Sequence, residues 1–143
     1  MQWNGVQMRR INVEREILDK YFPGKVKWID LRGDTKVEVT MTTNNDKTYC
    51  LRLYLPHDFP NSVPDLVVCN SPAPMPNWGG RGETHTLKQR DGNLRICHYR
   101  PSHWSDCNTF YQIFMKGRLW LEAYEGYLRT GAPVDNFLRH APL

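Results

Sequence analysis

Apolar residues follow a helical period near both ends of the chain and a strand period between them. Between about Met8 and Phe22 they fall near one helical face, and Pro23-Gly24 is suited to end a helix. From Thr109 onward, apolar and aromatic residues recur at spacings of three and four as far as Thr130–Pro133. This pattern predicts an amphipathic N-terminal helix and a long helix within about Thr109–Arg129, whose aromatic stripe packs as core.

Three segments between these helices are rich in β-branched and aromatic residues, and the second and third alternate apolar with polar positions. They are KVKWIDL, KVEVTMT and KTYCLRLYL, separated by turn-forming residues at Arg32–Asp34 and Asn44–Asp46. DLVVC, at Asp65–Cys69, is a fourth candidate strand. We therefore expect an α+β domain in which helices cover one side of a four-stranded antiparallel meander.

Composition is typical of one domain that spans residues 1–143. The chain is 40% hydrophobic, and it contains no repeat and no linker long enough to divide it. Six of the ten prolines lie within Pro56–Pro76, and Asn77–Gly82 is also rich in loop-forming residues, so little regular structure is expected there.

Charge and hydropathy exclude several classes of function. The net charge of +4 is spread along the chain without a run of five basic residues, which disfavours nucleic-acid binding. No apolar run approaches the length of about eighteen residues that a membrane helix requires, and the first ten residues are too polar for a signal peptide. We expect a cytoplasmic protein with no membrane contact.

Four cysteines, at positions 50, 69, 97 and 107, are expected to be free thiols. Cys50 and Cys69 lie in apolar strand-like segments, which predicts small buried side chains. Cys97 and Cys107 lie among polar residues and histidines, so they are the better candidates for chemistry.

A proline pattern suggests a family resemblance. In LPHDFPNSVPDLVV, three pairs are spaced as in the strand-end pattern of ubiquitin-conjugating (UBC) enzymes: Leu55-Pro56, Phe59-Pro60 and Val63-Pro64. Prolines at these positions rigidify a connection that leaves a sheet without offering backbone donors to another strand.

A second stretch, HTLKQRDGNLRICHYRPSHWSDCNTF, resembles the catalytic segment of that family. The matching roles are filled, in order, by His85, Gly92, Cys97, Trp104 and Thr109. The form C-x-Y-R-P-x-x-W and the ending WLEAYEGYLRTG look closest to the prokaryotic conjugating-enzyme-like proteins of cyclic-oligonucleotide (CBASS) antiphage systems, which act on a cGAS-like nucleotidyltransferase. The resemblance implies a UBC-like fold in which an active-site loop precedes the long C-terminal helix.

Two departures from the family pattern bear on the chemistry. The family's His-Pro-Asn reads His85-Thr86-Leu87, so the asparagine that supports the oxyanion or orders the loop is missing. Two more residues separate Gly92 from Cys97 than in the eukaryotic pattern, so either the loop is longer or the cysteine position, which would fall on Arg95, is lost. The match of CHYRPSHW to the bacterial form favours the longer loop. The SPAPMPNWGGRGET segment before His85 is interpreted as a bacterial or partner-specific insertion.

The resemblance makes Cys97 the candidate catalytic residue, because a carrier thiol must be nucleophilic and remain a good leaving group. His85, His98 and Asn93 are the candidate supporting residues, with His85 equally able to order the loop through hydrogen bonds. Cationic neighbours stabilise a thiolate, although adjacent residues on an extended segment point to opposite faces, so contact between His98 and Cys97 is not assumed. Two alternatives for Cys97 remain open: an inert thiol, or a zinc ligand with His98, His103 and Cys107.

The candidate partner-binding residues are Arg95, Arg100 and Trp104. Both arginines could steer an acidic tail or its terminal carboxylate, or could simply be solvated. Trp104 is expected to pack under the active-site loop. A groove beside Cys97, between the proline-rich segment and the Asn93–Trp104 loop, would receive the tail.

Two functions stay open at this stage. In the first, Cys97 accepts the C-terminal carboxyl of a ubiquitin-like protein or of a cGAS-like nucleotidyltransferase as a thioester and passes it to an amine. That chemistry needs no cofactor and no metal, but the chain has no phosphate-binding loop, so activation needs a separate activating enzyme or a partner that arrives activated. In the second, a non-catalytic UBC-fold variant binds a peptide tail or a ubiquitin-like surface.

Overall fold

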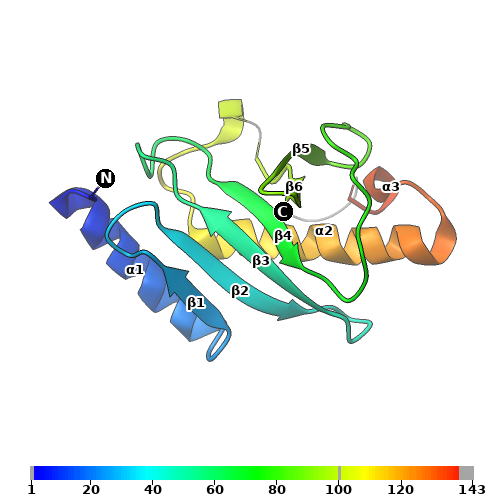
Figure 1. Cartoon of the computed structure of the whole chain (residues 1–143), viewed down its shortest axis with the longest axis horizontal. Coiled ribbons are helices and arrows are strands. Elements are labelled where there is room, and N and C mark those ends of the chain that lie inside the picture. Colours follow the sequence, from blue (N-terminus) through cyan, green and yellow to red (C-terminus); the bar gives the residue numbers. More distant parts are fainter. Residues whose placement is uncertain (1, 100, 139–143) are drawn as a thin grey trace.

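The computed structural model describes residues 2–99 and 101–138, and within them it contains three α-helices, six strands and one 3-10 turn (Figure 1). In chain order these are α1 (Gly5–Tyr21), β1 (Val26–Ile29), β2 (Lys36–Thr42), β3 (Thr48–Tyr54), β4 (Asp65–Asn70), β5 (Thr86–Arg90), β6 (Asn93–Ile96), the 3-10 turn (Pro101–His103), α2 (Phe110–Thr130) and α3 (Val134–Leu138). Arg100, one of the predicted partner-binding residues, lies outside the described residues.

Both long helices begin at a capping box. The side chain of Asn4 accepts from the backbone N–H of Gln7, and the side chain of Gln7 accepts from the N–H of Asn4, so α1 starts three residues before the predicted Met8. Thr109 and Gln112 form the same reciprocal pair at α2. Gly131 ends α2 in the left-handed conformation with φ of 77°.

The sheet has the strand order β1-β2-β3-β4-β6-β5, and all neighbours are antiparallel. The predicted α+β class is confirmed, but the sheet has six strands where four were expected. The missing pair is the short β5–β6 hairpin, whose residues are largely charged or polar. Its tight turn at Asp91-Gly92 has positive φ at both positions, 52° and 75°, which an Asp-Gly pair tolerates.

One face of the sheet forms the core against α2. Alternate residues of β2 and β3 on this face are buried, among them Val37, Val39, Leu51 and Leu53. Helix α2 lies close to the sheet at Gly117, where an added Cβ would stand 2.7 Å from Leu51 Cδ1 and 2.9 Å from Leu66 Cδ2. No helix among the described residues is long and apolar enough to cross a lipid bilayer.

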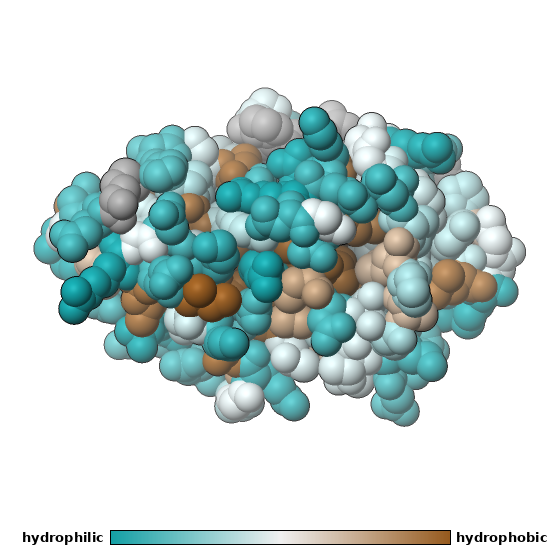
Figure 2. All heavy atoms as spheres, in the orientation of Figure 1, coloured by the Kyte–Doolittle hydropathy of each residue, from teal (hydrophilic) through white to brown (hydrophobic). Residues whose placement is uncertain are grey.

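The opposite face of β2–β4 carries polar residues and two of the cysteines. Cys50 and Cys69 were expected to be buried, but both are only half-buried. The prediction was wrong because Cys50 alternates with the core residues Tyr49 and Leu51, so its side chain points away from α2. In the view of Figure 2 the surface is mostly hydrophilic, and apolar side chains appear there as small, separate groups.

Candidate functional site

Cys97 directly follows β6, and the backbone that leads into it is tied to other elements. β6 pairs with β4 through Leu66–Ile96 and with β5 through Thr86–Ile96. The N–H of Cys97 donates to the carbonyl of His85 at 2.9 Å. The Cys97 side chain is partly exposed. A fixed backbone therefore presents a thiol that solvent can reach.

Two surface cavities share Cys97. The first, of about 410 Å³, lies between residues 63–65, which lead into β4 and include its first residue, and the Arg95–Tyr99 segment, with Leu87 of β5 also lining it. Its walls are thus the proline-rich segment and the cysteine-bearing segment, which is where a groove was expected. The second cavity has a volume of about 260 Å³. Besides Cys97 it is lined by His85, which precedes β5, by His103 of the 3-10 turn and by Lys116 of α2.

His98 is buried beside Cys97 and anchors this segment to the proline-rich one. Its Nε2–H donates to the carbonyl of Pro64 at 2.6 Å, whereas its Nδ1 is buried and has no hydrogen-bond partner among the described residues. Burial, helped by the nearby Lys116, lowers the pKa of His98 to about 4, against an opposing effect of the Pro64 hydrogen bond. At neutral pH His98 is therefore an uncharged positioning residue, and it does not serve as a cation for the thiolate.

Lys116 of α2 is a cationic residue that lines the second cavity. Its ammonium lies 3.5 Å from the centre of the Tyr99 ring and donates to the carbonyl of His98 at 3.4 Å. Partial burial lowers the pKa of Lys116. Sequence reasoning missed this residue, because it is one polar position within the helical stripe and only the fold brings it to the cysteine.

His85 holds the loop on the other side of Cys97. Its backbone is left-handed, with φ of 52°, an uncommon state for a histidine, and its Nε2 lies 2.6 Å from Oδ1 of Asp135 in α3. This geometry agrees with the structural alternative for His85, although its ring also lines the second cavity. Asp135 was not predicted, since no motif links it to a residue so distant in the chain.

Arg95 is held within the sheet instead of pointing freely toward a partner. Its Nε donates to the carbonyl of Lys88 at 2.8 Å, and its Nη1 pairs with Asp65 at 3.0 Å. The guanidinium therefore joins β5, β6 and β4, so a simply solvated Arg95 was the wrong alternative. Arg95 still lines the first cavity, where its remaining N–H groups could meet a tail.

Trp104 packs under the loop as expected. Its Nε1–H donates to the carbonyl of Pro60 at 3.0 Å, and its ring meets Tyr99 edge-on at 5.4 Å. It thereby joins the segment after Cys97 to the proline-rich connection. Asn93, in contrast, pairs with Arg90 at the turn end of β6 and lines neither of the Cys97 cavities. The fold does not bring Asn93 to the thiol.

The alternative zinc set is not assembled. Among the described residues, the one group of three ligand atoms that all lie within 4.8 Å of one another is Glu38, Cys50 and Cys69. Cys97, His98, His103 and Cys107 do not form such a group, and the Nε2 of His98 is already bonded to Pro64. The Cys107 side chain is exposed on the loop that leads to α2.

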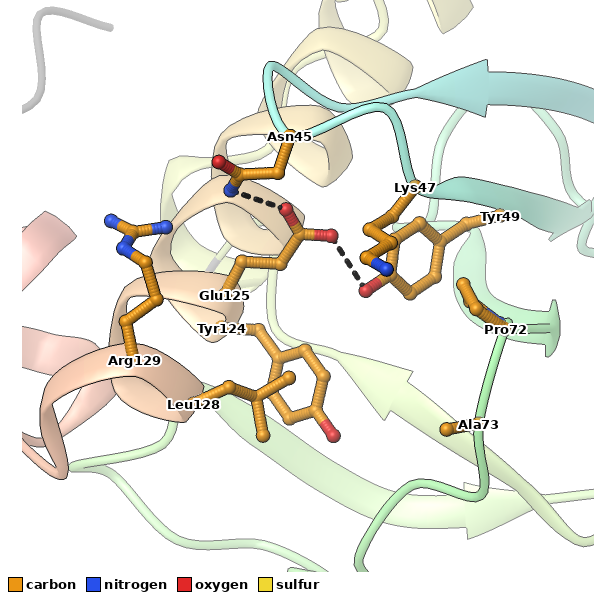
Figure 3. A pocket seen from close by; sticks show the side chains of 9 residues that line it. All are labelled: Asn45, Lys47, Tyr49, Pro72, Ala73, Tyr124, Glu125, Leu128 and Arg129. Carbon is orange, nitrogen blue, oxygen red and sulfur yellow. Dashed lines mark hydrogen bonds between the residues drawn. The ribbon is translucent and has the colours of Figure 1, made fainter.

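A separate apolar cavity of about 530 Å³ lies at the other end of α2 (Figure 3). Glu125 forms part of its wall, and its carboxylate accepts hydrogen bonds from Thr43, Asn45 and Tyr49, each 2.8 Å long. Burial, followed by the Glu125 hydrogen bond, raises the pKa of Tyr49. Lys47 and Arg129 also line the cavity, and none of its described lining residues is a cysteine or a histidine.

The chain was also compared with known proteins. No protein-family model matches it, and no curated protein matches it either.

Proposed function

We propose that this chain is a UBC-like acyl carrier of bacterial antiphage defence. Cys97 accepts the C-terminal carboxyl of a partner protein, either a ubiquitin-like protein or a cGAS-like nucleotidyltransferase, and transfers it to an amine in the cytoplasm. The observation that carries the proposal is the partly exposed Cys97 thiol where two surface cavities meet. The sequence resemblance at residues 55–68 and 85–110 suggests the class of reaction, acyl transfer through a thioester.

The arrangement of the elements supports the same proposal. Helix α1 is followed by β1–β4 as sequential antiparallel neighbours, then by the cysteine-bearing segment and the 21-residue helix α2. This is the order that the UBC resemblance implies: an N-terminal helix, a meander, an active-site loop and a long helix. The β5–β6 hairpin positions the segment that ends in Cys97.

In the proposed first step, the Cys97 thiolate attacks the activated carbonyl of the partner's C-terminus. A carbon–sulfur bond forms, and the activating group, an adenylate or the thiol of an activating enzyme, departs. In the second step the amine attacks the thioester, the carbon–nitrogen bond forms, the amine proton passes to solvent, and the Cys97 thiolate leaves. The first cavity would hold the extended tail, because its walls are rigidified by prolines and by strand pairing.

Lys116 is the proposed replacement for the missing asparagine. The position of that asparagine is filled by Leu87, which has no hydrogen-bond donor in its side chain and lines the first cavity. Lys116 lines the second cavity together with Cys97, and its ammonium can stabilise both the thiolate and the oxyanion of the tetrahedral intermediate. The Tyr99 ring and the His98 carbonyl hold the ammonium in place.

The same Leu87 favours a second candidate, a non-catalytic UBC-fold variant. An exposed leucine next to the groove suits binding of an apolar side chain of a tail without any covalent step. The two candidates differ in whether a bond to Cys97 forms.

The test is the intact mass of the protein after co-expression with its neighbouring genes, with purification in acid without reductant. The carrier proposal predicts an adduct on the wild type that a thiol reductant releases, and an adduct on Cys97→Ser that survives reduction because it is an oxygen ester. Cys107→Ser is the matched control and keeps the reducible adduct. Non-covalent co-purification of the partner with wild type and Cys97→Ser alike, without any mass increase, would support the binding variant instead.

A further inference from the structure

The polar face of the sheet gathers two thiols and a carboxylate from three neighbouring strands. Glu38 lies on β2, Cys50 on β3 and Cys69 on β4, and one ligand atom of each lies within 4.8 Å of the other two. The Sγ of Cys69 lies 4.0 Å from the Oε2 of Glu38 and 3.4 Å from the backbone carbonyl of Cys50. All three residues are half-buried, so solvent and ions can reach them.

Strand pairing explains why these side chains meet. Glu38 pairs with Arg52, which places Glu38 diagonally across from Cys50. The register between β3 and β4 shifts after Cys50, so that Cys50 pairs with Asn70 while Leu51 pairs with Val68. Cys69 is the additional residue of this bulge, and bulges commonly redirect a side chain. The cluster is built on paired strands, which hold its atoms more firmly than a loop would.

The spacing is close to that of a tetrahedral metal site. Zinc–sulfur and zinc–oxygen bonds of about 2.3 and 2.0–2.2 Å place neighbouring ligand atoms roughly 3.5–4 Å apart. The Glu38 carboxylate already lies close to that range, since its Oε2, the oxygen that Arg52 contacts, is 4.0 Å from Cys69 Sγ. Small side-chain rotations would bring the three atoms onto one ion, and solvent would fill the fourth position.

The charges around the cluster also match a divalent ion. Two thiolates and one carboxylate carry three negative charges, of which a divalent ion neutralises two. Arg52 supplies the third positive charge, since its guanidinium contacts Oε2 of Glu38 at 2.7 Å and leaves Oε1 without a hydrogen-bond partner among the described residues. A hydrogen-bonded carboxylate is typical of the groups that orient metal ligands.

We propose that Glu38, Cys50 and Cys69 form a Zn²⁺ site on the outer face of the sheet, independent of the chemistry at Cys97. Thiolate ligands favour zinc over magnesium or calcium, and the carboxylate favours it over copper(I). Binding replaces the proton of each thiol, and both protons are released to solvent. The ion joins β2, β3 and β4 without any change in oxidation state.

The test is titration of the full-length chain, kept reduced with a phosphine, with Cd²⁺ and then with competing Zn²⁺. Cd²⁺ bound to thiolates gives an ultraviolet charge-transfer band, and native mass spectrometry counts the ions. We expect one ion per chain, displacement of Cd²⁺ by Zn²⁺, and a higher thermal midpoint with Zn²⁺. Cys50→Ser and Cys69→Ser should each weaken binding by more than roughly tenfold and reduce the band, whereas Arg52→Gln should weaken it by roughly tenfold with the band retained.

Cys107→Ser is the matched thiol control and should bind as the wild type does. Circular dichroism of each variant without metal checks that the sheet is intact, which is expected because the substituted positions are half-exposed. Unchanged affinity in Cys50→Ser, or no ion on the reduced wild type, would overturn the proposal.

Discussion

Glu125, a residue of α2, and His98, whose carbonyl accepts from Lys116 of α2, are both buried polar residues, but their surroundings differ. The carboxylate of Glu125 accepts from three side chains, and the preceding turn of the helix adds the Glu122 carboxylate, which accepts from the N–H of Asn44. His98 makes one hydrogen bond through its ring and leaves Nδ1 buried without a partner. Buried polar groups are nearly always paired, so full pairing marks a structural role and an unpaired atom calls for another explanation. The unpaired Nδ1 belongs to the residue next to Cys97, a half-exposed cysteine that lines two of the cavities described above.

The largest expected effect on stability comes from the fully paired Glu125. Glu125→Leu would leave the donors of Thr43 and Tyr49 buried without an acceptor, and we expect the free energy of unfolding to fall by roughly 2–4 kcal/mol. Tyr49→Phe removes one donor from the same network and should cost about 1 kcal/mol. Chemical denaturation measures both values. Equal, small losses in the two variants would mean that the Glu125 network is not structural.

The contribution of His98 should appear in the pH dependence of the free energy of unfolding. The pKa of His98 is about 4 in the folded chain against 6.5 for an ordinary histidine. Between these values the unfolded chain binds a proton that the folded chain does not, so stability is full above about pH 6.5 and falls as the pH is lowered. The loss should reach about 2–3 kcal/mol near pH 4.

Denaturation at several pH values, compared between wild type and His98→Gln, isolates this contribution. The glutamine amide can still donate to the Pro64 carbonyl but does not titrate in this range. The other histidines and the carboxylates are common to both proteins, so they cancel in the comparison. Parallel pH profiles would show that His98 is not the responsible group.

Gly117 lies on α2 between the two ends and sets the distance of the helix from the sheet. Gly117→Ala places a methyl group against the buried Leu51 and Leu66, so we expect a loss of about 1–2 kcal/mol in spite of the better helix propensity of alanine. Gly126→Ala is the matched control. Its Cβ would meet Phe137 at 2.8 Å, but that ring is 37% exposed and can move. Thermal denaturation should rank Gly117→Ala as the less stable variant.

The smallest effect on stability should accompany a large effect on chemistry. Lys116→Met should change the free energy of unfolding by no more than about 0.5 kcal/mol, because it is a partly exposed residue without an ion pair among the described residues. The proposed mechanism predicts that transfer from Cys97 nonetheless slows by roughly a hundredfold, because the variant lacks the cation assigned to the oxyanion. Lys116→Arg keeps the charge and should retain part of the rate. Single-turnover transfer rates provide the comparison, and equal rates in Lys116→Met and wild type would remove Lys116 from the mechanism.

The contrast also shows what the sequence could predict. Periodicity located both long helices and the α+β class, because each depends on residues that are neighbours in the chain. The Asp91-Gly92 pair was a readable hairpin signal, but strands as short and polar as β5 and β6 have too few apolar residues to be recognised around it. The half-exposed position of Cys50 follows from strand alternation. In KTYCLRLYL the apolar residues Tyr49, Leu51 and Leu53 occupy alternate positions, so the sequence already placed Cys50 on the opposite face.

Other parts of the site depend on tertiary contacts that no local pattern contains. The bond between His85 and Asp135 spans 50 positions, and His98 and Pro64 are 34 positions apart. Arg95 was predicted at the groove, but its ion pair with Asp65 requires the β4–β6 pairing. Motif reasoning could therefore propose Cys97 as a candidate, while the neutral state of His98 and the position of Lys116 near it required the fold.

The most direct test locates the adduct on the chain. The protein, co-expressed with its neighbouring genes and kept in acid without reductant, would be digested and its peptides sequenced by mass spectrometry. We expect the C-terminal residues of the partner on the peptide that contains Cys97, joined by a bond that hydroxylamine and thiols cleave. An adduct on Cys107 or on a lysine alone, with the Cys97 peptide unmodified, would contradict the assignment of Cys97 as the carrier.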